Sequence, residues 1–220
     1  MPQFIAAALI CLLTVSVQDP ARAQPANFGD AMAWYEREAA KGSAKAQFLL
    51  GLLSERGTGK RKKDVSAAFK WFRKAAEQGH PQAQYKIAAA YHFGKSIAVD
   101  PELAVLWYRR AAGQGVGEAQ HNLAHMLLNG IGTARSAGEA ARWYAENARQ
   151  GFGPSQLALG YLYLQGTGVI ADMAEAWAWF RAAEVRGVDG AAKARAEAEN
   201  RLSLDDLKRA ETLAKPRLRK

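Results

Sequence analysis

The sequence predicts an all-α fold: a right-handed α-solenoid of about four helix–loop–helix repeats with half-repeat caps. Three regularities of the 220-residue chain indicate it. A Trp–aromatic pair recurs at steps of 37, 36, 36 and 36 residues, a glycine follows each Trp by eight residues, and a short polar residue precedes it by seven. Such spacing is typical of stacked identical units. The pairs are Trp34–Tyr35, Trp71–Phe72, Trp107–Tyr108, Trp143–Tyr144 and Trp179–Phe180.

The first 23 residues are set apart by composition. Phe4–Val17 is an apolar run that is shorter than the about 20 residues of a membrane-spanning helix, and Ala21–Arg22–Ala23 follows it. This pattern is typical of a secretory signal with an Ala-x-Ala cleavage site. We therefore predict a signal peptide at 1–23 and an exported mature chain, with an uncleaved membrane anchor as the alternative.

The second helix of each repeat begins at the short polar residue, whose side chain can accept from free N–H groups of the first turn. It runs through the Trp–aromatic pair to the glycine, which suits a left-handed helix end. Ser136 with Glu139, and Asp172 with Glu175, match capping boxes. The predicted capping residues are Asn27, Asp64, Asp100, Ser136 and Asp172.

The first helix of each repeat opens with Ala–Gln or Ser–Gln and reaches a small residue. The small residues are Gly51, Ala88, Ala124 and Gly160. We expect the two helices of a repeat to approach closely there, and the core to consist of the Trp–aromatic pairs with columns of Ala and Leu.

The repeats divide the chain into a predicted series of segments. An N-terminal half-repeat helix at 28–42 precedes four repeats, at 43–79, 80–115, 116–151 and 152–187. Capping helices at 188–215 and a basic tail at 216–220 follow. Terminal units of a solenoid are expected to be atypical and polar on the outside.

These repeats resemble the Sel-one-like repeat (SLR) family, which is related to tetratricopeptide repeats. The clearest copy spans Ser155–Gly187, with Leu159–Gly160, Tyr163, Gly166–Thr167–Gly168–Val169, Asp172 and Trp179–Phe180. The resemblance covers about residues 28–214. It implies a non-catalytic protein–protein interaction scaffold of the bacterial envelope, such as a periplasmic regulator of signalling or of envelope assembly. With the predicted signal, we expect a periplasmic protein, or alternatively a secreted one.

One cysteine-rich branch of that family has been linked to β-lactam binding or hydrolysis. Cys11 is the chain's single cysteine and lies within the predicted signal, so we do not extend that activity to this chain and predict no enzyme. His121 and His125 are one helical turn apart and could share a metal ion, but spacing shows no third ligand. We therefore predict no metal and no cofactor; groove-lining or pH-sensitive histidines are the alternative.

By the resemblance, one stripe of the first helices lines the concave face, where an envelope protein or peptide would bind. Its residues vary from repeat to repeat, as a binding surface requires. Phe48 and Tyr85 could equally fill space between stacked repeats. The predicted binding residues are Phe48, Leu52, Tyr85, His92, Phe93, His121, His125, Asn129, Tyr161 and Gln165.

A basic run, Lys60–Arg61–Lys62–Lys63, occurs in the first repeat only. Four adjacent cations repel one another, and the formal net charge of the chain is +9, so an anionic polysaccharide or lipid surface is an alternative partner. The run could also be a solvated loop. Nucleic acid is not expected outside the cytoplasm, and no second apolar run is long enough to span a membrane after signal cleavage.

Overall fold

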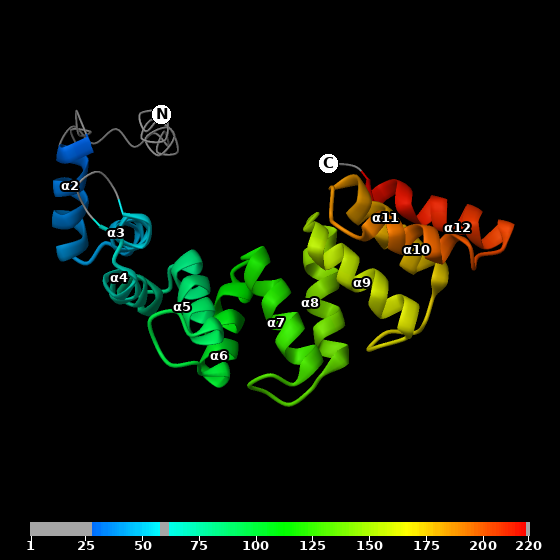
Figure 1. Ribbon diagram of the computed structural model, residues 1–220, viewed down its shortest axis with the longest axis horizontal. Coiled ribbons are helices and arrows are strands. Elements are labelled where there is room, and N and C mark those ends of the chain that lie inside the picture. Colours follow the sequence, from blue (N-terminus) through cyan, green and yellow to red (C-terminus); the bar gives the residue numbers. More distant parts are fainter. Residues whose placement is uncertain (1–27, 58–61, 219–220) are drawn as a thin grey trace. The chain divides into compact units, whose positions relative to one another are not determined.

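The computed structural model describes residues 28–57 and 62–218, which form helices joined by turns and loops, without a strand in these ranges (Figure 1). Most of the helices are 13 residues long. They are α2 (Phe28–Ala40), α3 (Ala44–Arg56), α4 (Val65–Glu77), α5 (Pro81–Phe93), α6 (Pro101–Gly113), α7 (Gly117–Asn129), α8 (Ala137–Arg149), α9 (Gly153–Gln165), α10 (Met173–Val185), α11 (Ala191–Glu199), α12 (Leu204–Ala214) and the 3-10 helix η1 (Lys215–Arg217).

Four predictions lie wholly or partly outside the described residues: the signal peptide at 1–23, the cap at Asn27, the Lys60–Arg61 half of the basic run, and positions 219–220 of the basic tail. Within the described ranges, each helix is too short or too polar to cross a bilayer.

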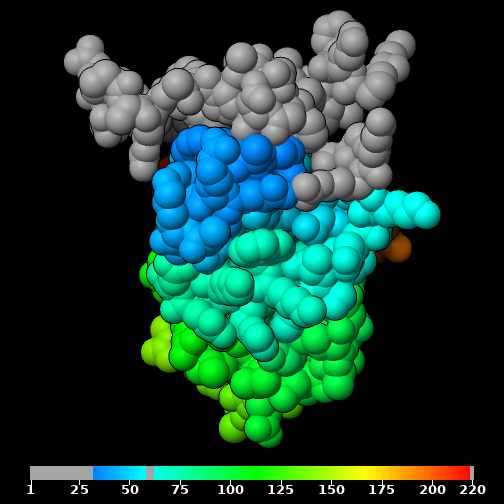
Figure 2. All heavy atoms as spheres, turned by 90° about the vertical axis from the view of Figure 1, so that its left-hand side faces the viewer, coloured from blue at the N-terminus to red at the C-terminus, as the bar shows by residue number. Residues whose placement is uncertain are grey.

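The chain divides into two compact units, Met1–Gln78 and Gly79–Lys220. In the first unit α3 packs against both α2 and α4, and Figure 2 shows the blue α2 directly against cyan α3. In the second unit each helix from α5 to α10 packs on the next one along the chain, and α11 and α12 both pack on α10. Packing between sequence neighbours is the arrangement of an α-solenoid, so the predicted fold class is confirmed.

Most second helices begin as predicted. Asp64, Asp100 and Asp172 each accept a hydrogen bond from the backbone N–H three residues on, at 2.8, 2.9 and 3.0 Å. The capping box at Ser136 is wrong, because Ser136 makes no side-chain cap bond. The Glu139 carboxylate instead accepts from Arg109 of α6, a charged partner that offers a stronger hydrogen bond than a neutral amide.

The predicted core is correct in its Ala and Leu columns. Within the aromatic pairs, however, the second residue is buried more deeply than the Trp. The second aromatic is buried in four repeats: Phe72, Tyr108, Tyr144 and Phe180. The Trp of each pair is less buried. Four of the five are half-buried, namely Trp34, Trp71, Trp107 and Trp143, and among the five only Trp179 is buried. Adjacent residues of a helix point about 100° apart, so one of each pair faces the first helices and the other faces the edge of the stack.

The close approach at the small residues is confirmed. A Cβ atom on Gly51 would lie 2.5 Å from the Phe72 ring, and one on Gly160 would lie 2.5 Å from the Phe180 ring. The aromatic ring of the second helix therefore occupies the space that a side chain on the first helix would need.

The glutamine of each Ala–Gln or Ser–Gln pair has a role that the repeat pattern did not reveal. Gln47, Gln84, Gln120 and Gln156 are all buried. The amides of Gln47, Gln120 and Gln156 donate to the carbonyl oxygens of Ala39, Ala112 and Ala148 at 3.0–3.2 Å. Each bond ties a first helix to the second helix that precedes it, and satisfies a carbonyl at that helix end.

Candidate functional site

Six of the predicted binding residues lie on α5, α7 and α9 of the second unit and reach its surface, and we call them the first-helix stripe. His125, Asn129 and Gln165 are exposed, and His92 is half-buried. Phe93 and Tyr161 are 58% and 40% exposed, among the few large hydrophobic side chains in the described ranges that face solvent. The stripe is His92, Phe93, His125, Asn129, Tyr161 and Gln165.

The α5 end of the stripe is a stacked pair of rings. The His92 and Phe93 rings are 4.3 Å apart and nearly parallel, and His92 Nδ1 lies 3.4 Å from the hydroxyl of the buried Tyr108. Burial lowers the pKa of His92, and the charge of His125 on α7 lowers it further. The neutral form of the His92 ring is therefore favoured. The contact with the Tyr108 hydroxyl holds this ring in position.

His121 does not lie on the open part of this surface. Its Nδ1 lies 3.0 Å from the Ser155 hydroxyl on α9, and its ring packs against Tyr144 and Phe152. Burial, followed by the charge of His125, lowers the pKa of His121. These contacts give His121 a structural role between α7, α8 and α9. Among the described residues, no three His, Cys, Asp or Glu side chains are grouped as metal ligands.

Phe48, Leu52 and Tyr85 are half-buried. The Phe48 ring lies 5.7 Å from that of Phe72, and the Tyr85 ring 6.0 Å from that of Tyr108. Both aromatic side chains therefore pack on the buried ring of the following second helix. This is the space-filling alternative that the sequence left open.

Of the basic run, the described residues Lys62 and Lys63 are exposed. They directly precede Asp64, the cap of α4.

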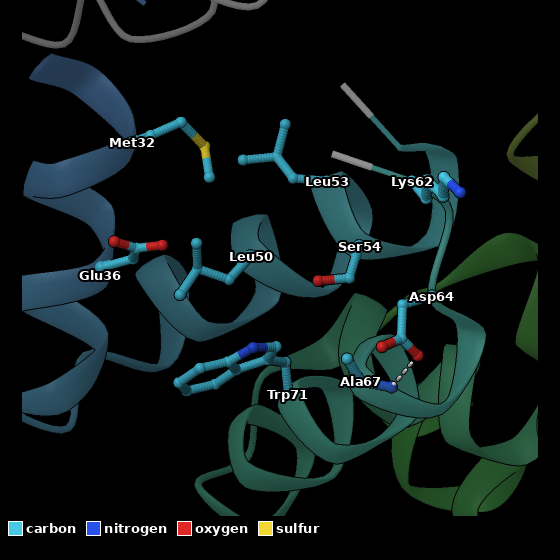
Figure 3. Close-up of a pocket in the computed structure, with 9 residues that line it drawn as sticks. All are labelled: Met32, Glu36, Leu50, Leu53, Ser54, Lys62, Asp64, Ala67 and Trp71. Carbon is cyan, nitrogen blue, oxygen red and sulfur yellow. Dashed lines mark hydrogen bonds between the residues drawn. The ribbon is translucent and has the colours of Figure 1, made fainter. Parts of the chain in front are cut away.

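A cavity of about 350 Å³ opens in the first unit, on the side of the helices that carries Trp71 (Figure 3). Met32 and Glu36 project into it from α2, Leu50 and Leu53 from α3, and Trp71 closes it from α4. Its wall therefore combines apolar side chains with polar and charged ones, among them the Glu36 carboxylate of α2. The remaining lining residues are Ser54, Lys62, Asp64 and Ala67.

The sequence contained a signal for this cavity that the repeat period alone does not reveal. Ser54 aligns with Tyr91, Leu127 and Tyr163 of the later repeats, and Ala67 aligns with Leu103, Glu139 and Glu175. The first repeat has small side chains at two positions where the others have large ones. A comparison of residue volumes at equivalent positions would have located the cavity.

Known proteins share these repeats. The Sel1 repeat model matches residues 44–80, 81–116, 117–152 and 153–184, which together are more than half of the chain. A Sel1 repeat protein from Oxalobacter formigenes is 32% identical, with a TM-score of 0.68; the match covers 83% of this chain and 71% of that one.

Two further relatives are matched over a smaller part of their length. A protective antigen of uropathogenic Escherichia coli with an SLR fold is 29% identical, with a TM-score of 0.58, over 87% of this chain and 49% of that chain. Chitin synthase regulatory factor 3 of Schizosaccharomyces pombe is 40% identical over 63 residues, 29% of this chain and 7% of that protein. This chain thus spans about half of the antigen and less than a tenth of the yeast factor.

Sel1 repeat proteins are generally protein-interaction scaffolds and generally non-catalytic. The four matched repeats and the solved relatives together show that the chain belongs to the Sel1 repeat family.

Proposed function

We propose that this protein is a non-catalytic scaffold of the bacterial envelope that binds a partner protein or peptide on the first-helix stripe. The proposal places the mature chain in the periplasm, after cleavage of the signal at 1–23, and gives it a part in regulating signalling or envelope assembly. The observation that carries it is the exposure of Phe93 and Tyr161 on a scaffold whose other aromatic side chains are mostly buried or half-buried.

The chemistry of the stripe supports a polypeptide partner. Aromatic and histidine rings present an apolar body with a polar tip, which suits both the apolar side chains and the backbone of a peptide. Asn129 and Gln165 add amides that can both donate and accept. Exposed aromatic residues of this kind are frequent among the residues that dominate binding energy.

Affinity capture from a periplasmic extract tests the proposal, with a His125→Ala/Tyr161→Ala double variant beside the unmodified protein. We expect one discrete protein to be retained by the unmodified chain and lost by the variant, and to bind again when both components are purified. A Leu106→Ala/Val185→Ala variant is the matched control, because these exposed apolar residues lie on the second helices. Circular dichroism checks that every variant is folded; equal retention by both variants would contradict the stripe.

A second candidate is binding of anionic polysaccharide or lipid through Lys60–Arg61–Lys62–Lys63. It is supported by the exposed Lys62 and Lys63 and by the net charge of +9. Because salt screens exposed charges, binding to anionic vesicles should fall steeply between about 50 and about 300 mM salt. Neutralising the four basic residues should abolish it and leave capture through the stripe intact.

A further inference from the structure

We infer that the partner segment bound by the first-helix stripe is acidic, with a carboxylate side chain that lies between His92 and His125 and has apolar neighbours on both sides. This inference rests on the proposed function, because it assigns the chemistry of the partner at that same stripe. It is supported by the charges of the stripe, by the hydrogen-bond donors that the two histidines present, and by the exposed rings beside them.

The helices that carry the stripe are poor in acidic residues. α5 and α9 contain no Asp or Glu, and α7 contains one, Glu118 in its first turn. Glu118 stands about 10 Å before His125 along the helix axis, since a helix rises about 1.5 Å per residue. Lys95 is exposed just beyond α5, and its Nζ lies 5.9 Å from the centre of the Phe93 ring. The part of the stripe around His92 and His125 is therefore complementary to a carboxylate rather than to a cation.

A buried hydrogen-bond network fixes which nitrogen of His92 can donate. The Tyr108 hydroxyl accepts from Asn122 Nδ2 at 3.1 Å and lies 3.4 Å from His92 Nδ1. Burial raises the pKa of Tyr108, so its hydroxyl keeps its proton and can donate to Nδ1. The proton of the neutral imidazole then lies on Nε2. His92 thus presents an N–H donor on the side of its ring that faces away from the buried Tyr108.

His125 offers a second donor close to the first. Besides burial, the charge of His125 lowers the pKa of both His92 and His121, which places His125 near both rings. His125 is exposed, whereas His121 is hydrogen-bonded to Ser155. A carboxylate between His92 and His125 can accept from both, and would offset the repulsion between their protonated forms. A neutral amide or hydroxyl would provide the hydrogen bonds without this charge.

Exposed rings on both sides of His125 indicate that the acidic residue lies within a segment rather than at its end. Phe93 is exposed on α5 and Tyr161 on α9, and α7, which carries His125, lies between these two helices in the second unit (Figure 1). Apolar side chains before and after the acidic residue can therefore each pack on a ring. A C-terminal carboxylate bound at His125 would leave one of the two rings uncovered.

Peptides displayed on phage test the inference, because a peptide fused to the coat protein has no free C-terminal carboxylate. We expect selection from a randomised library on the immobilised protein to enrich peptides with Asp or Glu between aliphatic or aromatic residues. The decisive variant is His92→Phe/His125→Phe, which removes the ring nitrogens and keeps two aromatic rings. Peptides selected on this variant should retain the apolar residues and lose the enrichment in acidic ones.

Binding of one synthetic peptide measures the effect. The most enriched peptide is made with an acetylated N-terminus and an amidated C-terminus, and again with its acidic residue replaced by the corresponding amide. The amide should bind the unmodified protein about tenfold more weakly, as expected for the loss of a charged hydrogen bond, and should bind His92→Phe/His125→Phe as the acidic peptide does. Lys95→Ala is an independent second variant that should reduce the difference between the two peptides.

Arg142→Ala is the matched control, because Arg142 is an exposed cation on the second helix α8. It should retain the full difference between the two peptides, and circular dichroism checks that every variant is folded.

The outcomes separate this inference from the proposed function. Enriched peptides without acidic residues, whose binding Tyr161→Ala abolishes, would leave the stripe as a binding surface and overturn the acidic partner. The absence of any enriched peptide would overturn both. An acidic preference that persists in His92→Phe/His125→Phe, or one that Arg142→Ala removes, would overturn the assignment to the histidine pair. Binding of the synthetic peptide only with a free C-terminus would overturn the assignment to a side chain.

Discussion

The ring of Phe180 occupies the space beside Gly160: a Cβ atom on Gly160 would lie 2.5 Å from Phe180 Cδ1. Gly160→Ala should therefore lower the free energy of unfolding by about 1–3 kcal/mol, the usual cost of overpacking a core. Gly138→Ala is the control, because nothing lies within 4 Å of its added Cβ, and it should stabilise the protein by about 0.4–1 kcal/mol. Urea unfolding measures both; an unchanged midpoint for Gly160→Ala would refute the contact.

Tyr108 should matter more to stability than the neighbouring Trp107. Tyr108 is fully buried, and its hydroxyl accepts from Asn122 Nδ2 at 3.1 Å, whereas Trp107 is half-buried. We expect Tyr108→Ala to cost about 3–5 kcal/mol and Trp107→Ala clearly less. Thermal melting measures the stability loss of each variant. A larger loss for Trp107→Ala than for Tyr108→Ala would support a core centred on the tryptophans.

Asp100 should contribute more to stability as a helix cap than Ser136 does. The Asp100 carboxylate accepts from Leu103 N at 2.9 Å, and Ser136 makes no side-chain cap bond. Asp100→Ala should cost about 1 kcal/mol, while Ser136→Ala should leave the unfolding midpoint nearly unchanged. Equal losses from the two substitutions in urea unfolding would show that Ser136 caps α8 after all.

Arg217 should anchor the C-terminal segment. Its guanidinium lies over Trp179 and is paired with Glu175, and both charged side chains are largely buried. Removing one partner of a hydrogen-bonded charged pair leaves the other without compensation, so Arg217→Ala should cost about 1.5–3 kcal/mol. Arg110→Ala, which removes an exposed cation over Trp107, should cost at most about 1 kcal/mol. Melting temperatures and tryptophan emission test this; similar small losses would contradict an anchored tail.

Stability should decline as the pH falls from 7 to 5. The pKa of His92 and that of His121 lie below the ordinary value, so between the folded and unfolded pKa values the unfolded chain binds more protons. The resulting stability is present above the unfolded pKa of about 6.5 and is lost as the pH falls below it. His121→Gln should reduce the decline in melting temperature over this window, and an unaltered decline would exclude His121 as a source.

Two carboxylates should affect stability in a separate, more acidic pH range. The hydrogen bond from Arg109 lowers the pKa of Glu139, and that from Arg209 lowers the pKa of Asp172. A carboxyl with a lowered pKa contributes stability above its unfolded value, near about 4, and loses it as the pH falls through the folded value. The two contributions can therefore be separated by following melting from pH 7 to 5 and then below 4.

Much of the helical framework could be predicted from the sequence because its signals are local. Asp64 and Asp172 cap helices through the backbone N–H three residues on, and Gly79 and Gly151 take the positive φ that ends a helix. These features depend on residues within one turn of each other. The periodic recurrence of such signals was enough to predict the solenoid.

The candidate site was harder to predict because it depends on contacts between repeats. Phe93, His125 and Tyr161 lie on the exposed surface that the repeat register predicted. His121 occupies the same register but bonds to Ser155, 34 residues away. Only the partner of a side chain decides whether it faces a ligand or a neighbouring helix, and that partner lies in another repeat.

The sequence by itself thus determined the class of the fold, the family and the positions of its helices. The reason is that each repeat carries its own capping residues and glycines, and these recur with a period of 36 residues. Tertiary structure decided which aromatic of each pair is buried, where the buried glutamines donate, and how Arg217 covers Trp179. It also decided that small residues at 54 and 67 leave a cavity beside Trp71. The physical reason is that burial, pairing and empty volume are set by side chains on different helices, which only the packing of those helices brings together.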